Sequence, residues 1–246
     1  MMSKVTIVTG GSRGIGAATA KLLASHGHAV CVNYLSNADA ASKVVSEIEA
    51  AGGRALAVQA DTSVEADVMR MFETVDKELG TLTGLVNNAG TNGRRTRVDD
   101  LRSDEVCELL DINVLGCIIC AREAVKRMSI AHGGKGGAIV NVSSGSANIG
   151  NPGIGVLYAT SKGALNSFSI GLAQEVAAEG VRVNIVAPGM TQTDMPGADR
   201  IAAQASKIPM GRVAEPIEVA EAIYFLLSDN ASYIAGANIR VGGGRL

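Results

Sequence analysis

Short apolar runs rich in β-branched residues alternate with longer stretches of helical periodicity along the whole chain. Most of these runs lack polar alternation, which is typical of strands buried on both faces of a sheet. They predict strands at Val5–Val8, Ala29–Asn33, Ala55–Gln59, Gly84–Asn87, Ala138–Val142, Arg182–Val186 and Asn238–Val241. The segments between them predict helices at Gly14–His26, Ala38–Ala51, Val64–Leu79, Asp104–Ala131, Tyr158–Ala178 and Pro216–Ser228.

The regular alternation of strands and helices predicts an α/β fold. Crossover connections between parallel strands are right-handed and place helices on both faces of the sheet. We therefore expect a single Rossmann-like, doubly wound domain over residues 1–246, with a seven-stranded parallel sheet. No linker, internal repeat or low-complexity tract divides the chain. Ligands of such sheets bind outside the carboxyl ends of the strands, so the loops after the strands are the place to look for chemistry.

Composition narrows the class of protein further. Hydrophobic residues make up 47 % of the chain and charged residues 19 %, which excludes intrinsic disorder. The net charge of −2 provides no field that would gather nucleic acid or anionic lipid, so neither is expected as a partner. The opening MMSKVTIVTG has no signal-peptide pattern, and no apolar run reaches the roughly 18 residues of a membrane span. We expect a cytoplasmic protein.

Cysteine and histidine positions favour core residues over a metal site. Cys117 and Cys120 form a C-x-x-C pair, but they lie inside the apolar run Val114–Ala121 without a second pair at zinc spacing. The three histidines, His26, His28 and His132, also lack a partner at a suitable spacing. No metal is expected.

The first strand is followed at once by a glycine-rich turn, TGGSRGIG, over Thr9–Gly16. Glycines let a backbone turn tightly and approach a pyrophosphate, which then lies against the N-terminus of the next helix. The spacing is G-x-x-x-G-x-G, and a plain connecting turn is the alternative. Its position between the first strand and the first helix favours dinucleotide binding.

Tyr158 and Lys162 are four positions apart and so project from one face of a predicted helix. A tyrosine can donate the proton that a carbonyl oxygen needs after hydride transfer, and a nearby ammonium group favours the phenolate needed in the reverse direction. Ser143, Ser144 and Ser146 end the fifth strand, where a hydroxyl could bind the reacting oxygen. An exposed Tyr–Lys pair on a helix surface is the alternative.

Together these motifs resemble the short-chain dehydrogenase/reductase family, and the resemblance covers essentially the whole chain. The subtype it resembles prefers NADP and is similar to sugar and alcohol dehydrogenases and 3-oxoacyl-carrier-protein reductases. The resemblance implies a catalytic set of Asn113, Ser144, Tyr158 and Lys162, with Asn113 holding a water in a proton relay. Ser144 lies 14 positions before Tyr158, one more than is usual, which leaves Ser146 as a weaker alternative. The motifs that carry it are Thr9–Gly16, Asp61, Asn87–Gly90, Pro188–Gly189 and Thr193.

Cofactor contacts are expected along the ends of the first six strands. Val32–Asn37 contains no carboxylate, and Asp39 is the first, so the group that would repel a 2′-phosphate is missing. Arg13, with Ser36 or Asn37, is placed to bind that phosphate, which favours NADP(H) over NAD; binding of both cofactors is the alternative. The expected contacts are Gly10, Ser12, Arg13, Gly14, Ile15, Gly16, Asn33, Tyr34, Ser36, Asp61, Thr62, Asn88, Ala89, Gly90, Tyr158, Lys162, Pro188, Gly189, Thr191 and Thr193.

These observations predict an NADP(H)-dependent oxidoreductase that interconverts a small-molecule carbonyl and a secondary alcohol. One alternative is a 3-oxoacyl-carrier-protein reductase, which Glu179 disfavours because such enzymes often place Arg there to dock the carrier. A non-catalytic NADP-binding regulator is a weaker alternative, since it need not keep Ser144, Tyr158 and Lys162 together. The loops Gly145–Leu157 and Thr191–Lys207 are expected to shape the substrate pocket.

Two further expectations concern the surface. Arg94, Arg95 and Arg97 cluster after Gly90, and a solvated loop is favoured over recognition of an anionic substrate. The two longest predicted helices carry small and apolar residues on more than one face, which indicates a second burial partner. Together with the resemblance, this predicts a homotetramer.

Overall fold

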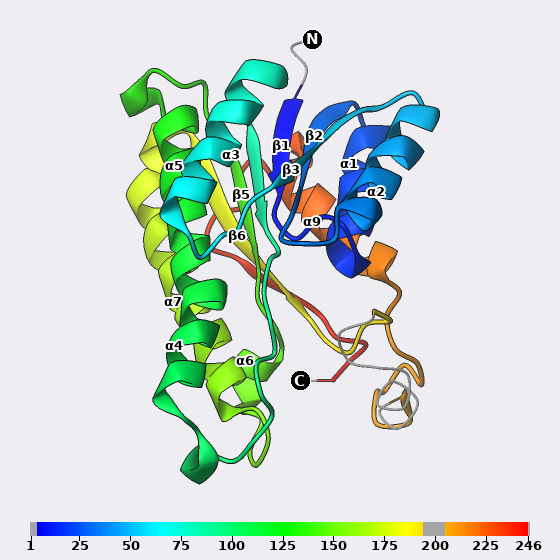
Figure 1. Cartoon of the computed structure of the whole chain (residues 1–246), viewed down its shortest axis with the longest axis vertical. Helices are drawn as coiled ribbons and strands as arrows, with labels where there is room; N and C mark the ends of the chain where they lie inside the picture. Colours follow the sequence, from blue (N-terminus) through cyan, green and yellow to red (C-terminus); the bar gives the residue numbers. More distant parts are fainter. Residues whose placement is uncertain (1–3, 194–204, 246) are drawn as a thin grey trace.

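The computed structural model describes residues 4–193 and 205–245, and its centre is one parallel seven-stranded sheet (Figure 1). The strand order is β3-β2-β1-β4-β5-β6-β7. The first three strands extend the sheet to one side of β1 and the last four extend it to the other, so the topological switch point lies between β1 and β4. All seven predicted strands are confirmed. They are β1 Lys4–Val8, β2 His28–Tyr34, β3 Arg54–Gln59, β4 Gly84–Asn87, β5 Gly137–Val142, β6 Val181–Pro188 and β7 Asn238–Val241.

Helices cover both faces of the sheet, as Figure 1 shows. One hydrophobic core lies against α1, α2 and α9, and the other lies against α3, α5 and α7. This two-faced burial explains why the central strands are apolar throughout. The α-helices are α1 Gly14–Ser25, α2 Ala38–Ala50, α3 Glu65–Glu78, α4 Ser103–Leu110, α5 Gly116–Met128, α6 Ser146–Ile149, α7 Val156–Val176 and α9 Pro216–Leu227.

The predicted helix over Asp104–Ala131 is longer and more regular than the observed one. A π-helical turn over Asp111–Leu115 separates α4 from α5. The helix then stops at Met128, because Ser129 is extended and its hydroxyl oxygen accepts a hydrogen bond from the Ala131 N–H at 3.0 Å. The short helix α6 also was not predicted.

Cys117 and Cys120 lie in the core, as the sequence predicts, whereas Cys107 is exposed. Cys31, Cys117 and Cys120 are free and buried, and burial raises the pKa of Cys31 and Cys117 to about 12. Across residues 4–193 and 205–245, no cluster of three His, Cys, Asp or Glu side chains is arranged to hold a metal ion. Over the same ranges, every helix is too short or too polar to span a bilayer.

Candidate active site

The glycine-rich turn after β1 is tightly packed. Gly10 and Gly14 have φ of +61° and +51°, a region that side-chain-bearing residues rarely adopt. A Cβ at Gly16 would overlap the carbonyl oxygen of Gly10. Asn33 holds the turn from β2, because its Oδ1 accepts from the Gly10 N–H at 3.1 Å and its carbonyl accepts from Gly11 at 2.8 Å.

Thr9 joins this turn to the end of β4. Its Oγ1 accepts hydrogen bonds from the N–H groups of Asn88 at 2.9 Å and Ala89 at 3.0 Å. The Asn88 amide donates in return to the carbonyls of Thr9 at 3.0 Å and Gly10 at 3.1 Å. Thr9 was not among the predicted site residues. The sequence feature that could have identified it is a hydroxyl at the end of the first strand, next to the glycines.

The start of α1 can accept an anion. Arg13 is the N-cap residue, its exposed side chain makes no capping hydrogen bond, and the first turn contains no acidic residue. The first N–H groups of a helix and its positive dipole end favour phosphate. Thr193 faces this turn, since a Cβ at Gly14 would lie 3.0 Å from its Cγ2. These residues therefore fit the pyrophosphate of a dinucleotide.

Some predicted cofactor residues are already engaged by the protein. The amide of Asn33 is buried and donates to the carbonyl of Ala60 at 3.0 Å, so it positions the glycine turn from within the sheet. The Asp61 carboxylate accepts from the N–H of Ser63 at 2.9 Å and from its hydroxyl at 2.7 Å. Asn37 caps α2 through the Ala40 N–H at 2.9 Å, whereas Ser36 is exposed. Direct cofactor contact by Asn33 and Asp61 stays a prediction.

Lys162 and Tyr158 lie one turn apart on α7. Lys162 is only 4 % exposed, and its Nζ donates to the carbonyl of Val142 at 2.9 Å. The same Nζ is 5.9 Å from the centroid of the Tyr158 ring. Burial lowers the pKa of Lys162 from 10.5 to about 8. The pair is thus partly enclosed, and the alternative of a solvated pair on the helix surface is wrong.

The three candidate serines after β5 have different surroundings. Ser143 is buried and its hydroxyl donates to the carbonyl of Lys162 at 3.2 Å. Ser144 Oγ accepts from the N–H of Ser146 at 3.1 Å, which leaves its own hydrogen available to a ligand. Ser146 Oγ accepts from the amide of Asn151 at 2.6 Å. Asn151, at φ +47°, lies in the loop that contains the extra residue before Tyr158.

Asn113 lies in the π-helical turn and clamps two elements of the site. Its Oδ1 accepts from the Thr91 N–H at 2.8 Å, and its Nδ2 donates to the Thr91 carbonyl at 2.9 Å and to Ser161 Oγ at 3.0 Å. The side chain is 1 % exposed. It therefore holds the loop after β4 against α7, and its part in a proton relay stays a prediction.

One cavity of about 330 Å³ joins the glycine turn, through Ile15, to Ser144, Tyr158 and Lys162. Its walls come from the ends of β4, β5, β6 and β7, from α6 and from the start of α7. Asn113 lies behind the wall, and Ser12, Arg13, Tyr34, Ser36, Asp61 and Thr62 lie outside it. The predicted residues that line it are Ile15, Asn88, Gly90, Ser144, Ser146, Tyr158, Lys162, Pro188, Gly189, Thr191 and Thr193.

Several lining residues were not predicted. Arg240 and Arg245 come from β7 and the segment after it, whereas Ile149, the last residue of α6, and Ile154 lie within the predicted loop Gly145–Leu157. The predicted substrate loop Gly145–Leu157 thus does shape the cavity. Of the second loop, Thr191–Lys207, residues 194–204 lie outside the described residues. The signal for Arg240 was a charged residue between the apolar Ile239 and Val241 in a predicted strand.

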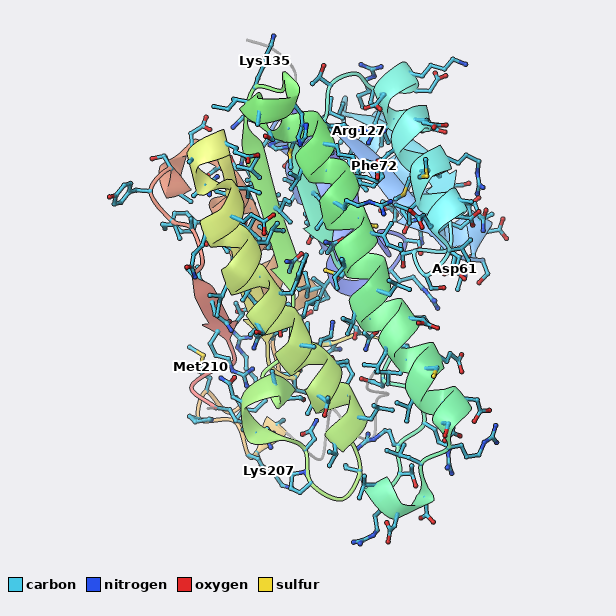
Figure 2. All side chains as sticks on the ribbon, turned by 90° about the vertical axis from the view of Figure 1, so that its left-hand side faces the viewer. Asp61, Phe72, Arg127, Lys135, Lys207 and Met210 are labelled. Carbon is cyan, nitrogen blue, oxygen red and sulfur yellow. The ribbon has the colours of Figure 1, made fainter. Side chains whose placement is uncertain are left out.

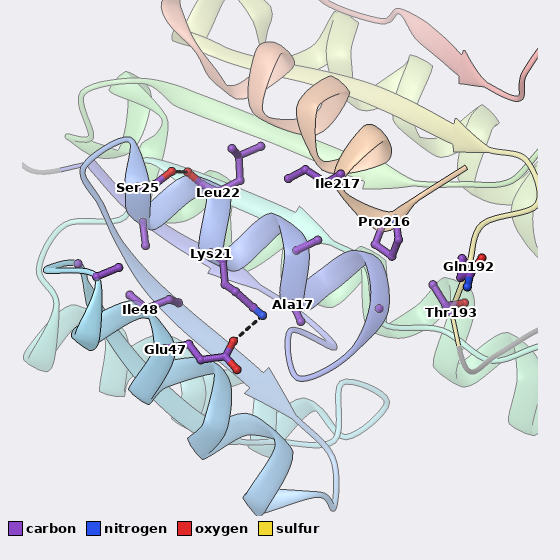
Figure 3. Close-up of a pocket in the computed structure, with 15 residues that line it drawn as sticks. Ala17, Lys21, Leu22, Ser25, Glu47, Ile48, Gln192, Thr193, Pro216 and Ile217 are labelled. Carbon is purple, nitrogen blue, oxygen red and sulfur yellow. Dashed lines mark hydrogen bonds and ion pairs between the residues drawn. The ribbon is translucent and has the colours of Figure 1, made fainter. Parts of the chain in front are cut away.

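A larger hollow of about 740 Å³ lies between α1, α2 and α9 (Figure 3). Its wall is mostly aliphatic, and an ion pair between Lys21 and Glu47, 2.5 Å apart, crosses it. It reaches the glycine turn at Gly14 but includes none of the four predicted catalytic residues. The smaller cavity is therefore the candidate active site.

Comparison with known proteins identifies the family. The family described as "Enoyl-(Acyl carrier protein) reductase" matches residues 10–245. A 3-oxoacyl-[acyl-carrier-protein] reductase of Synechocystis is 38 % identical over 99 % of this chain and 97 % of its own length. The chain belongs to the short-chain dehydrogenase/reductase family. As a short-chain dehydrogenase/reductase, it is an NAD(P)-dependent oxidoreductase.

Two other similar members of the family have names that give no substrate. An uncharacterized oxidoreductase of Escherichia coli, YgfF, is 48 % identical over 98 % of this chain and 99 % of its own. A crystal structure of a Burkholderia cenocepacia short-chain dehydrogenase in complex with NADP superposes with a TM-score of 0.92, at 37 % identity over 98 % of this chain and 97 % of its own. The resemblance drawn from the sequence motifs is confirmed.

Proposed function

We propose that this short-chain dehydrogenase/reductase interconverts a carbonyl and a secondary alcohol with NADP(H), and that Tyr158 is its acid/base. One observation carries the proposal. A single cavity brings Ser144, Tyr158 and Lys162 together with the mouth of the glycine turn, at the carboxyl ends of the strands. Hydride donor and proton donor must meet at one carbonyl, and this is the part of the fold where they can.

Bound NADPH supplies the hydride, and the protein's own groups manage the charge that develops on the substrate oxygen. The Ser144 hydroxyl donates a hydrogen bond to that oxygen, and the Tyr158 hydroxyl gives it a proton. In the reverse direction the Tyr158 phenolate accepts the proton. The Lys162 ammonium favours that phenolate, and its low exposure strengthens the effect because water screens the charge less.

The preference for NADP over NAD rests on two features near the glycine turn. Arg13 is exposed and its side chain makes no capping hydrogen bond, which leaves its guanidinium available to a 2′-phosphate. β2 ends without a carboxylate, and Asp39 lies already in the first turn of α2. The NADP complex of the B. cenocepacia relative agrees with this preference.

A second candidate is reduction of a 3-oxoacyl chain on a carrier protein. The Synechocystis relative with that name favours it. The residue before Gly180 argues against it, because Glu179 is acidic and its carboxylate accepts a hydrogen bond from the Ser129 hydroxyl. An acidic carrier would meet a like charge there.

The assembly we propose is a homotetramer. Figure 2 shows α4 and α5 lying beside α7 on one face of the molecule. On that face Leu115 and Ile170 are 42 % and 45 % exposed, and both Gly163 and Gly171 have open space where a Cβ would be. Exposed apolar side chains beside glycines suit helix-on-helix packing between copies.

Substitution of Tyr158 by Phe tests the catalytic assignment. The variant keeps the ring but lacks the proton donor, so we expect turnover to fall by about 10²- to 10⁴-fold while NADPH affinity stays within severalfold. Turnover is followed as NADPH oxidation over a panel of ketones, sugars and acyl thioesters, and affinity by fluorescence titration. Tyr233→Phe is the matched control, because Tyr233 is fully exposed. Retention of a tenth or more of the turnover, with chemistry rate-limiting, would refute the role of Tyr158.

A further inference from the structure

The described lining of the active-site cavity carries an excess of positive charge. Four of its lining residues are cationic, namely Arg95, Lys162, Arg240 and Arg245. Among the residues that the structure describes, no Asp or Glu lines it. The whole chain carries a net charge of −2, so this concentration of positive charge is local. A cavity lined by one sign of charge concentrates ligands of the opposite sign.

Arg240 is the central cation of this set. Its Nη1 donates to the carbonyls of Pro188 at 3.3 Å and Ala187 at 3.4 Å, and its Nε and Nη2 donate to the Arg245 carbonyl at 3.3 Å. No carboxylate of residues 4–193 and 205–245 lies within ion-pair distance of it. Burial, followed by the charge of Arg245, lowers the pKa of Arg240 below its usual range. Within the described part of the chain this half-buried cation has only carbonyl partners and no counter-ion.

The residue next to Ser144 leaves room for Arg240. A Cβ at Gly145 would overlap the Arg240 guanidinium, so only glycine allows the guanidinium to lie there. The backbone at Gly145 is ordinary, with φ of −60°, and conformation alone does not require glycine. This contact places the charge beside the residue that follows the proposed oxygen-binding serine.

The arginine cluster after β4 divides into paired and unpaired members. Arg94 pairs with Glu105 at 2.7 Å, and Arg97 pairs with Asp99 at 3.0 Å. Arg95 lines the cavity, and it has no ion-pair partner within the described ranges. The favoured expectation of a solvated loop therefore suits Arg94 and Arg97, whereas Arg95 lines the cavity.

We propose that the carbonyl substrate is itself an anion, bearing a carboxylate or a phosphate, and that Arg240 and Arg95 bind this group. The proposal rests on the proposed reductase function and adds its substrate class. Guanidinium groups bind both anions through paired N–H donors, so the chemistry is shared. The carbonyl then meets Ser144 and Tyr158, while the charged end lies toward β7. The cavity of about 330 Å³ limits the substrate to a small molecule.

Matched pairs of charged and neutral ketones test the substrate class. For carboxylate the pair is 4-oxopentanoate and 4-oxopentanamide, and for phosphate it is dihydroxyacetone phosphate and dihydroxyacetone. We expect kcat/KM for at least one anion to exceed that of its neutral partner by about 10-fold or more, the low end for one charge-assisted hydrogen bond. Added NaCl should reduce the ratio, since salt screens exposed charges. The two pairs separate carboxylate from phosphate recognition.

Arginine variants assign the effect to residues. In Arg240→Met and Arg95→Met the anion preference should fall to within about 3-fold, and Arg240→Lys should keep part of it. Arg94→Met is the matched control, because Arg94 belongs to the same loop but pairs with Glu105. Arg95 is exposed, so its variant tests the proposal even where Arg240→Met fails to fold. A rise in KM for NADPH instead of for the anion would assign the arginines to the cofactor and overturn the proposal.

Binding measurements separate this proposal from the proposed function. Calorimetry on the Tyr158→Phe variant with NADP⁺ present measures the preference for the anion over its neutral partner in the absence of turnover. The variant keeps both arginines, so this preference should be intact. Equal binding of anion and neutral partner would overturn the anion site, whatever the turnover. Tyr158-independent turnover with a clear anion preference would instead refute the catalytic role of Tyr158 and leave the anion site standing.

Discussion

Burial of the charged Lys162 side chain should measurably lower the free energy of unfolding of the protein. Its pKa is lowered from 10.5 to about 8, because burial disfavours the charged form. One pKa unit corresponds to about 1.36 kcal/mol, so the charged side chain is disfavoured by roughly 3 kcal/mol in the folded state. The hydrogen bond from its Nζ to the Val142 carbonyl does not offset this cost.

The pH dependence has a definite sign. Between the folded pKa of about 8 and the unfolded value of 10.5, the unfolded chain binds the proton that the folded protein has lost. Stability therefore rises with pH through this window, and below about pH 8 the full cost remains. From about pH 7 to about pH 9.5, the wild type should gain roughly 2 kcal/mol relative to Lys162→Met. The buried thiols lose protons in this range only in the unfolded chain, because burial raises the pKa of Cys31 and Cys117 to about 12 in the folded protein. Up to about pH 9.5 these folded thiols stay protonated in both proteins, so their contribution cancels in the difference.

Urea unfolding at the two pH values, followed by circular dichroism, measures this difference. Lys43→Met is the control, because Lys43 lies on the exposed face of α2 and should show no such change. A wild-type minus Lys162→Met difference that stays the same within about 0.5 kcal/mol at both pH values would refute the reasoning. It would mean that the ammonium group is well solvated in the folded protein.

Three further predictions follow from other residues. Arg13→Ala should weaken NADPH binding by roughly 10- to 150-fold and leave NADH nearly unchanged, in competitive titrations of both cofactors; an equal loss for both contradicts it. Burial and Lys4 lower the pKa of His28 to about 4, so stability is complete above its unfolded value of 6.5 and falls as pH drops toward 4. His28→Gln should remove about 2 kcal/mol of that fall between pH 7.5 and 5 in urea unfolding, and an unchanged fall contradicts it. Sedimentation velocity should give four times the chain mass, and Ile170→Asp should give smaller species; a monomeric wild type would exclude the tetramer.

The sequence was sufficient for the sheet because each strand signal is local. Val30 and Val140 are fully buried in strands that are covered by helices on both faces. Short runs of such residues between glycine-containing turns predict few structures other than a buried strand. The positions of Tyr158 and Lys162 followed from the same logic, since four residues on a helix place two side chains on one face. Their joint enclosure in one cavity agrees with that spacing.

Other features depend on contacts between distant segments and so escape a sequence pattern. The π-helical turn at Asn113 coincides with hydrogen bonds to Thr91 and Ser161, which lie in other elements. Arg240 reaches Gly145 across 95 positions of sequence, and the pairings of β5 with β6 and of β6 with β7 bring them together. Asn33 was predicted to bind the cofactor because it ends a predicted strand. Its side-chain amide instead hydrogen-bonds the Gly10 N–H and the Ala60 carbonyl within the protein. A strand-end position shows where a residue lies but not which partner takes its side chain.

Two of the four cations of the cavity, Lys162 and Arg240, suggest why this site costs stability without ligands. Within the described residues, Lys162 is buried without a carboxylate partner and Arg240 donates only to carbonyls. Uncompensated charges of this kind weaken the folded state. A ligand that brings negative charge to the same cavity would relieve the cost on binding, and a ligand that binds only the folded state stabilises it by mass action. An anionic carbonyl substrate would thus relieve the Arg240 charge in the ground state, whereas the oxygen charge that Tyr158 and Ser144 meet develops only during reduction.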